Sequence, residues 1–417
     1  MIHRLFGSTQ GTRAGSANAQ ADRLAGLGSR LSPRHMTRSA ELCVLLARGY
    51  FPPDAQSRAR DMMSANMDWG QVVDCAMRQE VFPLVYRNLR SLGYERVPSP
   101  IFRELEAAYR GNVLRSDLLA RELCRLLAVF ACAGVRAMPL KGVGLSDFLY
   151  GDHALRVSGD LDILVAPEEV SETIAALCRS GYGPTMEDRI PGDVCRLNDM
   201  EYQLGRRESK ITYTVEVHWA LVWGASVDQS FLADLWREAG LRSFLGTSVL
   251  GMSPEWELMF LAAHAARHRW RGLKWLADIH DLCSLKAIDW RKLDEKASIF
   301  GWHRLLGDAL DATAALFGVS LPEQFAARLR PVRAAVYLRP VSPLDPVHAM
   351  WYLSRRLDGP LKRFRYVTRH LFRPTLVDRD AIRLPHRLQA LHYVIRPFRL
   401  LLKFPSWHLQ RVLSTWK

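Results

Sequence analysis

Two aspartates, Asp160 and Asp162, stand two residues apart in a run of apolar residues that ends at Val165. The alternating pattern predicts a β-strand over 160–165, in which every second side chain points to the same face. Asp160 and Asp162 would therefore lie together, while Leu161 and Ile163 face the other way. Two carboxylates at this spacing repel each other unless a cation lies between them. The hard, oxygen-preferring ions Mg²⁺ and Mn²⁺ suit such a pair.

A third carboxylate stands in a second alternating stretch, residues 214–219. Val215 and Val217 would occupy one face of this strand, and Glu216 and His218 the other. If the two strands are neighbours, Glu216 joins the two aspartates. Three carboxylates of this kind can hold two metal ions, which activate an attacking oxygen and stabilise a leaving phosphate.

The same residues have a plainer interpretation. Ser158, Gly159 and Asp160 can form an ordinary turn, with Asp162 solvated on a half-exposed strand. Glu216 taken alone is more often a solvated strand residue than a metal ligand. The order of the three acids along the chain is what favours a metal site.

Several of these segments together resemble the nucleotidyltransferases of the polymerase-β superfamily, and within it a bacterial group of uncharacterised nucleotidyltransferases. The resemblance covers roughly residues 125–285, and the segments that carry it are Lys141-Gly142, Arg156, Gly-Asp-Leu-Asp-Ile-Leu-Val at 159–165 and Val-Glu-Val-His-Trp at 215–219. It implies metal-dependent transfer of NMP from an NTP to a hydroxyl, or similar, acceptor on a small molecule, sugar, peptide or protein. The implied fold is α+β, with a small mixed β-sheet core flanked by helical N- and C-terminal regions.

By this resemblance Asp160, Asp162 and Glu216 are the catalytic residues and hold Mg²⁺ or Mn²⁺. The residues expected to bind the NTP substrate are Lys141, Gly142, Arg156 and Lys274. The chain lacks the Gly-Ser pair with which the wider superfamily holds the triphosphate. Phosphate binding would then depend on the charge of Lys141 and on N–H groups at a helix N-terminus.

Asp278 is expected to orient a nucleobase or a metal-bound water, and Arg267 is an alternative to Lys274 for reaching the phosphates. Lys274 and Asp278 can equally form a surface ion pair, since they are four residues apart on an expected helix. His264 and His268 have the same spacing, but no glutamate adjoins His264. We therefore expect these two histidines to be packed or hydrogen-bonded rather than metal ligands.

The length of 417 residues allows two or three domains with cores of their own. The sequence contains no uninterrupted apolar run of about 18 residues, so we expect no membrane-spanning helix. The first residues lack the apolar core of a secretory signal. The seven cysteines form no CxxC pair, which favours reduced, mostly buried thiols in a cytoplasmic protein.

Composition and periodicity, together with the resemblance, divide the chain into five regions. We expect a disordered leader (1–36), a helical N-terminal region (37–125), the nucleotidyltransferase core (126–250), a helical domain (251–330) and a basic, proline-punctuated region (331–417). The core should contain short strands near 135–140 and 202–204 and a helix over 167–180. Residues 255–283 read as one amphipathic stretch, and 290–330 as two further helices.

The positive charge is concentrated at the C-terminal end. Residues 328–417 hold 19 Lys or Arg against 4 Asp or Glu, a difference of +15, compared with +14 for the whole chain. Residues 391–416 mix aromatic and basic side chains, which suits an anionic membrane surface at the inner face of the membrane. Nucleic acid and a packed helix with snorkelling arginines are equally good interpretations. A non-catalytic scaffold, with a degenerate nucleotidyltransferase fold and this basic region as its binding part, is the alternative function.

Overall fold

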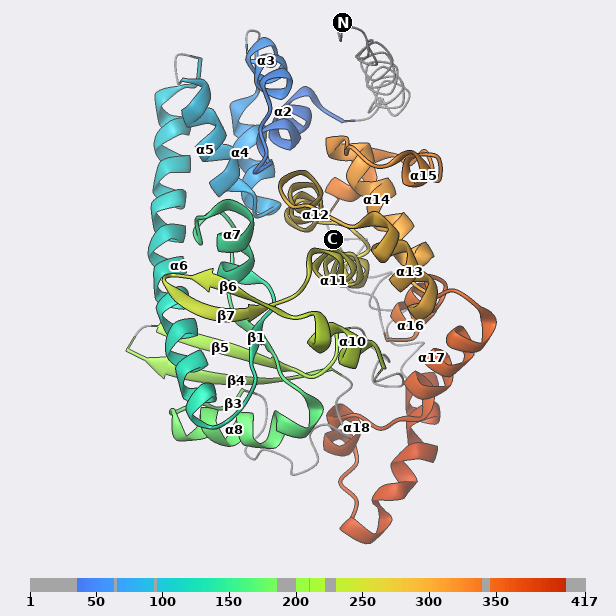
Figure 1. The fold of residues 1–417 in the computed structure, drawn as a ribbon. Helices are drawn as coiled ribbons and strands as arrows, with labels where there is room; N and C mark the ends of the chain where they lie inside the picture. The colour runs from blue at the N-terminus through green and yellow to red at the C-terminus, as the bar shows by residue number, and fades with distance from the viewer. Residues whose placement is uncertain are drawn as a thin grey trace, which may run out of the picture.

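The computed structural model describes seven segments of the chain. They are residues 36–63, 66–93, 96–185, 200–209, 211–221, 230–339 and 346–402. The expected disordered leader falls almost entirely outside them. Helices predominate in these segments, and a small sheet lies among them (Figure 1).

The N-terminal region is helical, as predicted. Its helices are α2 (Arg38–Leu46), α3 (Pro53–Met62), α4 (Trp69–Arg78), α5 (Phe82–Leu92) and α6 (Ser99–Cys132). Helix α6 is long because no glycine or proline interrupts its apolar pattern after Gly111, and Leu119, Leu123 and Leu126 are buried along one side. This side packs against the sheet.

The sheet has five strands in the order β1-β2-β5-β4-β3. The strands are β1 (Met138–Pro139), β2 (Leu161–Leu164), β3 (Gly183–Pro184), β4 (Glu201–Glu208) and β5 (Ile211–His218). Strands β2 and β5 are parallel, and the other three pairs are antiparallel. The sheet is therefore mixed, and the predicted α+β fold class is confirmed.

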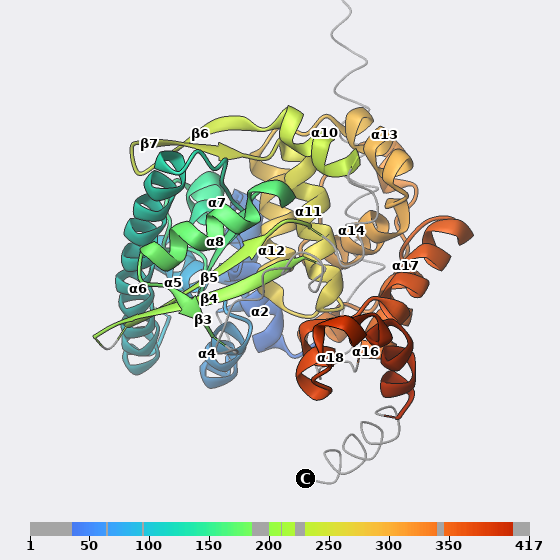
Figure 2. The same cartoon turned by 90° about the horizontal axis from the view of Figure 1, so that it is seen from below.

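Two helices cover one face of this sheet. Leu123 of α6 and Leu177 of α8 (Val170–Arg179) share a buried cluster with the strand residues Ile163, Val215 and Val217. Figure 2 shows α6 and α8 on the same side of β4 and β5. The apolar positions predicted to alternate along the two acidic strands face this cluster. Their carboxylates consequently point to the opposite face.

A hairpin that the sequence does not reveal lies beside β1. Strands β6 (Gly240–Phe244) and β7 (Thr247–Gly251) pair through a turn at Leu245 and Gly246, which have φ values of 49° and 76°. Two left-handed residues suit the twist of a two-residue hairpin. A leucine at the first turn position is unusual, so the sequence pattern indicates only a transition of mixed character here.

The C-terminal half is helical and packs around α11 and α12. Two short elements lie between the strands, α7 (Gly142–Tyr150) and η1 (Pro167–Glu169). The elements of the C-terminal half are α10 (Ser230–Glu238), α11 (Pro254–Arg267), α12 (Leu273–Leu285), α13 (Trp290–Phe300), α14 (His303–Phe317), α15 (Glu323–Ala326), η3 (Ala334–Leu338), α16 (Pro346–Ser354), α17 (Pro360–Phe372), α18 (Leu376–Ala381) and η4 (His386–Leu391). Trp256, Leu276 and Leu310 belong to the large core cluster that joins α11, α12 and α14.

Two expectations for this half are wrong. Residues 255–283 form two helices instead of one, because the chain turns at Arg269 and Trp270, which have φ values of 56° and 51°. His268 caps the end of α11, so His264 alone of the two histidines lies within that helix. Residues 290–330 contain three helices, the short α15 following the proline at 322. Among the described residues, no helix is long and apolar enough to cross a membrane.

The cysteines that the structure describes are free thiols, but fewer are buried than expected. Cys43 and Cys75 are buried, Cys124 and Cys283 are half-buried, and Cys132 and Cys178 are exposed. Cys195 lies outside the described residues.

Candidate functional site

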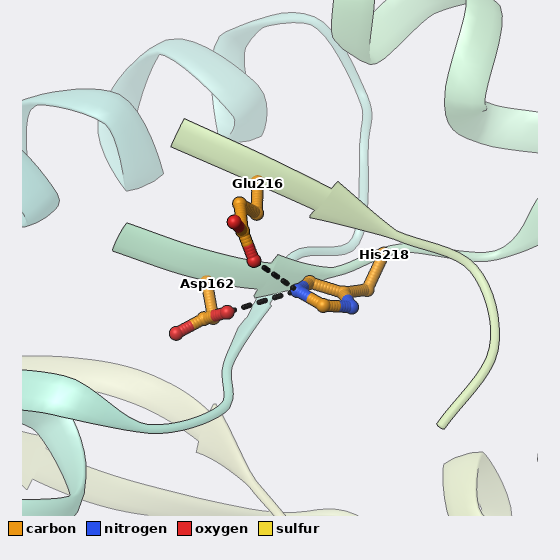
Figure 3. Close-up of side chains that lie close together, drawn as sticks. All are labelled: Asp162, Glu216 and His218. Atoms are coloured by element: carbon orange, nitrogen blue, oxygen red, sulfur yellow. Dashed lines mark hydrogen bonds and ion pairs between the residues drawn. The ribbon is translucent and has the colours of Figure 1, made fainter. Parts of the chain in front are cut away.

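The parallel pair β2–β5 places the acidic residues of the two predicted strands side by side. Asp162 and Glu216 are register partners in this pair. Their side chains project to the same side of the sheet and meet above it (Figure 3). The two strands are thus direct neighbours, which is the condition for a shared carboxylate site.

Asp160 stands immediately before β2 and takes part in the same electrostatic cluster. Burial raises the pKa of its carboxyl, and the negative charges of Asp162 and Glu216 raise it further, against the influence of Lys141. The loop that carries it is tied down: Arg115 donates to the backbone oxygens of Ser158 and Gly159, at 3.1 and 2.7 Å. The three acids therefore influence one another electrostatically, and like charges so arranged favour a bound cation.

His218 is a member of the cluster to which the sequence analysis gives no role. Its Nε2 lies 2.9 Å from Oδ1 of Asp162 and 3.5 Å from Oε2 of Glu216. Burial lowers the pKa of His218, but hydrogen bonding to the two carboxylates outweighs it and raises the pKa to about 9. The ring is therefore protonated at neutral pH. The alternation that reveals Glu216 also puts His218 on the same face, so this pattern could have found it.

Lys141 is the second cation on Asp162. Its Nζ lies 2.9 Å from Oδ1 of that residue, and both side chains are largely buried. Burial alone would raise the pKa of Asp162, yet Lys141 and His218 together hold it well below its usual range. The backbone N–H of Leu140 donates to the carbonyl of Asp162 at 3.0 Å, which fixes the start of α7 beside β2.

Gly142 is required where Lys141 enters α7. It has a φ of +63°, and a Cβ at this position would lie 2.7 Å from Oγ of Ser158. Glycine adopts this left-handed conformation without steric cost. The residue therefore allows the first turn of α7 to approach the loop that carries Asp160. A direct role in phosphate binding remains a prediction.

The charge network continues beyond His218. Its Nδ1 lies 3.3 Å from Oε2 of Glu201 on β4, and Glu201 pairs in turn with Arg267 at the end of α11, at 3.3 Å. Gln203 reaches Glu216 at 3.5 Å. Positive and negative groups alternate from Lys141 to Arg267, so the site is bordered by β4 and α11 as well as by the two central strands.

Arg156 and Asp278 form a buried ion pair at the edge of the site. The Nε of Arg156 lies 2.9 Å from Oδ2 of Asp278, and the two side chains are 6% and 2% exposed. The alternative of a surface pair between Lys274 and Asp278 is wrong, because Asp278 is buried against Arg156. Lys274 instead pairs with Glu80 and donates to the carbonyl of Val157 at 3.4 Å.

His264 and His268 line the side of the site formed by α11 and α12. Their ring centroids are 5.1 Å apart, and His268 stacks on Trp275 with 3.9 Å between centroids. Burial lowers the pKa of both rings, helped by the charges of Lys141 and Arg267, and the pKa of His268 reaches about 4. They are neutral packed rings, as the sequence leads us to expect.

The donor set fits a divalent metal ion. One ligand atom from each of Asp162, Glu216 and His218 lies within 4.8 Å of the others. Two carboxylate oxygens suit Mg²⁺ or Mn²⁺. The Nε2 of His218 could join them only after releasing its proton to make room for the ion, and an imidazole nitrogen is more acceptable to Mn²⁺ than to Mg²⁺. Asp160 does not belong to this group of ligand atoms, although its carboxylate is electrostatically coupled to Asp162 and Glu216. The notable difference from the expected three-carboxylate site is the imidazole.

Comparison with known proteins identifies a family for most of the chain. A sequence model for a family described as "uncharacterised nucleotidyltransferase" matches residues 65–318. A comparison with proteins of curated function gives no match. A crystal structure of an antigenic nucleotidyltransferase-like protein from Paracoccidioides brasiliensis is similar over 51% of this chain and 95% of that chain, with 16% identity and a TM-score of 0.31. At that TM-score the structural similarity carries no argument of its own.

Proposed function

Because the chain belongs to this uncharacterised nucleotidyltransferase family, whose model matches more than half of it, we propose that it is a metal-dependent enzyme that transfers NMP from an NTP to an acceptor hydroxyl. The observation that supports the metal dependence is the position of Asp162 opposite Glu216 in the parallel pair β2–β5. Asp160 precedes the same strand and is electrostatically coupled to both.

In this proposal Asp160, Asp162 and Glu216 would hold Mg²⁺ or Mn²⁺. A metal ion bound there would supply charge stabilisation for the phosphates and the attacking oxygen. The acceptor oxygen bonds to the α-phosphorus, the bond from that phosphorus to the bridging oxygen breaks, and pyrophosphate leaves. Glu216 takes the proton of the acceptor hydroxyl.

Lys141 and Gly142 would bind the triphosphate. Nζ of Lys141 is already at the carboxylate cluster, 2.9 Å from Asp162, so it is placed to share its charge with an incoming phosphate. The N-terminus of α7 starts at the next residue and presents backbone N–H groups, which favour anions.

Arg156 and Lys274 would act at longer range. Arg156 is buried on Asp278, and its charge also acts on Asp160 and Asp162. We therefore assign Arg156 to positioning the aspartates rather than to contact with phosphate. Lys274 lies at the loop carbonyl of Val157 and adds positive charge near the same loop. Catalysis would come mainly from positioning and electrostatic stabilisation, as in phosphoryl transfer generally.

Transfer of label from α-³²P-NTP in the presence of Mg²⁺ or Mn²⁺ tests the proposal. Asp162→Asn and Asp160→Asn should each abolish metal-dependent transfer, or metal-dependent NTP hydrolysis where no acceptor is supplied. Glu208→Gln is the matched control, since Glu208 is an exposed carboxylate at the far end of β4. Undiminished turnover in Asp162→Asn would exclude this site as the catalytic centre. Metal binding without any turnover in the wild type would favour the non-catalytic scaffold.

The C-terminal region supports a second candidate, attachment to an anionic membrane surface at the cytoplasmic face. Residues 392–402 are helical, and the apolar side chains Val394, Phe398 and Leu401 are 59, 62 and 68% exposed along one side. Arg396 and Arg399 instead point inward and pair with Asp378. The helix is packed through the side that holds His392, Arg396 and Leu400, so its arginines do not snorkel, and its apolar side is uncovered. An exposed apolar stripe in a strongly basic region favours a lipid surface over nucleic acid.

A further inference from the structure

Asp281 is a fully buried carboxylate of α12 that has no role in the proposed reaction. Its Oδ2 accepts hydrogen bonds from the backbone N–H of Gly49 at 2.7 Å and from the hydroxyl of Tyr150 at 2.8 Å. Its Oδ1 accepts from the backbone N–H of Tyr50 at 3.1 Å and lies 2.9 Å from Nδ1 of His280. A buried charge needs such partners. The N-terminal region, the end of α7 and α12 therefore meet at one carboxylate.

Two arginines lie close to this carboxylate. Arg87 donates to the backbone oxygens of Arg48 and Gly49, at 3.1 and 2.8 Å, and its guanidinium lies 5.9 Å from the ring centroid of Tyr150. Burial lowers the pKa of Arg48 and of Arg87, and the negative charge of Asp281 opposes this shift. The turn at residues 48–50 is thus held against α12 by charge as well as by hydrogen bonds.

The ring of Tyr150 packs tightly against this turn. A Cβ at Gly49 would lie 2.1 Å from Cε1 of Tyr150 and 2.8 Å from Oδ2 of Asp281. The backbone of Gly49 is not left-handed, so glycine is needed here for lack of space and not for its conformation. Close packing and the hydrogen bond together give the phenol ring one position.

Asp281 belongs to a row of polar residues on one face of α12. They are spaced four and three positions apart, and the row is Lys274, Asp278 and Asp281. Their partners, in the same order, are the carbonyl of Val157 at 3.4 Å, Nε of Arg156 at 2.9 Å and the hydroxyl of Tyr150 at 2.8 Å. One face of α12 therefore holds residues 150–157 at three points.

Residues 150–157 connect the two parts of the candidate site. Before them comes α7, which starts directly after Lys141, and after them come Asp160 and β2. Helix α7 has only nine residues, so it is a rigid rod of about 13 Å. Its last residue is Tyr150, and α7 and α12 contact each other (Figure 1). The bond to Asp281 thus fixes the end of α7 opposite Lys141, and losing it would allow the helix to tilt.

We propose that Tyr150 and Asp281 form a positioning pair that holds Lys141 in place for the phosphates of the substrate, an inference that rests on the proposed function. Neither member of the pair would touch the substrate. The pair acts through α7, which keeps Nζ of Lys141 at 2.9 Å from Asp162. A charge stabilises a ligand best when it is already in position, so a small displacement of Nζ should weaken phosphate binding.

Tripolyphosphate is the probe, because it has the phosphates of an NTP but no nucleoside to transfer. Isothermal titration calorimetry measures the binding of its Mn²⁺ complex to the full chain. Lys141→Ala should weaken binding, and this loss gives the contribution of the lysine. Tyr150→Phe removes only a hydroxyl and should weaken binding by about fivefold, as expected for one hydrogen bond. Gly49→Ala should also weaken it, because the new Cβ would displace the ring of Tyr150.

A double variant separates positioning from a general effect on stability. In the Lys141→Ala background, Tyr150→Phe should cause no further loss, because the group that it positions is gone. A residue that only stabilises the fold would give losses that add. Tyr182→Phe is the matched control, since the hydroxyl of Tyr182 donates to Glu122 at 2.6 Å on the opposite face of the sheet. This variant loses the same kind of bond and should bind tripolyphosphate as the wild type does.

Three outcomes would overturn the positioning pair. They are wild-type binding in Tyr150→Phe, a loss that adds to that of Lys141→Ala, and an equal loss in Tyr182→Phe. Failure of the proposed function gives different results. If the wild type does not bind the probe, or binds it no better than Lys141→Ala does, phosphates do not bind at Lys141 and both proposals are wrong. If the variants bind as expected but no NTP label is transferred, only the transfer reaction is wrong.

Discussion

The Nε of Arg156 donates to both carboxylate oxygens of Asp278, at 3.1 and 2.9 Å, across 122 residues of sequence. Arg156 lies in the loop before β2, and Asp278 lies in the middle of α12. The pair thus connects the strand that carries the aspartates to the C-terminal helices. Both residues are buried, so the contact is shielded from solvent and from salt.

Breaking this pair should be costly. Asp278→Ala leaves a buried guanidinium without its partner, and we expect a loss of about 3–5 kcal/mol in the free energy of unfolding, measured with urea. The double variant Arg156→Met/Asp278→Leu removes both charges and should recover much of that loss. If Asp278→Ala is as stable as the wild type, the pair does not hold the two regions together.

Glu216→Gln should weaken metal binding and transfer without disturbing the fold. The amide keeps the size of the side chain and removes one negative charge, so we expect Mn²⁺ affinity and transfer to fall by at least about 100-fold. Electron paramagnetic resonance of bound Mn²⁺ and the label-transfer assay measure the two effects. Gln203→Ala removes only the neighbour of Glu216 and should cost far less. Equal losses in both variants would contradict the assignment of Glu216 as a ligand.

Gly142→Ala should disturb the position of Lys141. Alanine at position 142 would have to adopt a left-handed φ, and its Cβ would lie 2.7 Å from Oγ of Ser158. Gly151 is also left-handed, with a φ of +67°, but a Cβ there would have no atom within 4 Å. Backbone strain should lower the free energy of unfolding of Gly142→Ala and of Gly151→Ala by about 1 kcal/mol or more. Transfer activity should fall further in Gly142→Ala than in Gly151→Ala. Adding Ser158→Ala should restore part of that difference. Equal activities of the two glycine variants would show that the close approach is unimportant.

The neutral ring of His268 predicts a loss of stability in acid. Its pKa is about 4 in the folded protein and about 6.5 when unfolded, since burial and the cations Arg267, Lys141 and Lys274 disfavour the charged form. Between pH 6.5 and pH 4 the unfolded chain therefore binds a proton at His268 that the folded chain does not bind. The free energy of unfolding falls as the pH is lowered through this interval.

Urea titrations at pH 7 and pH 5 measure this effect. The wild type should lose about 1–2 kcal/mol more than His268→Phe over that interval. Phenylalanine keeps a ring against Trp275 and removes the titration. Identical pH dependence in the two proteins would show that His268 titrates normally.

The exposed stripe of residues 394–401 predicts binding to lipid. The full chain should sediment with vesicles that contain phosphatidylglycerol and not with vesicles of phosphatidylcholine alone, and salt should weaken the binding. Phe398→Asp should release it. Leu114→Asp, at an equally exposed leucine of α6, is the control and should not. Salt-sensitive binding to RNA or DNA without binding to vesicles would favour the nucleic-acid interpretation instead.

The two acidic strands are predictable from sequence because each alternates between buried and polar side chains along a short stretch. Strand β2 is Leu161–Leu164 and strand β5 is Ile211–His218, close to the predicted ranges. Their adjacency can only be assumed from sequence, since strand pairing depends on the whole topology. His218 shares the pattern of Glu216, but its contact with Asp162 follows from the parallel register.

The contacts that sequence cannot predict join residues far apart along the chain. The family resemblance implies phosphate as the partner of Lys141 and Lys274, whereas Lys141 lies at Asp162 and Lys274 pairs with Glu80. A long flexible side chain carries no periodicity that indicates its partner. The turn at Arg269 and Trp270 is hidden for a related reason, because neither residue is one that normally takes the left-handed conformation.

The parallel pairing of β2 with β5 has a consequence for how the protein reaches its working state. Parallel neighbours cannot be joined by a tight turn. Asp162 and Glu216 therefore come together only after the 53 residues between them have formed a long connection that returns the chain to the same edge of β2. Closing so long a segment is entropically slow, and contacts of this kind tend to form late. The helices should thus form well before Asp162 and Glu216 come together, so the candidate site is completed late in folding.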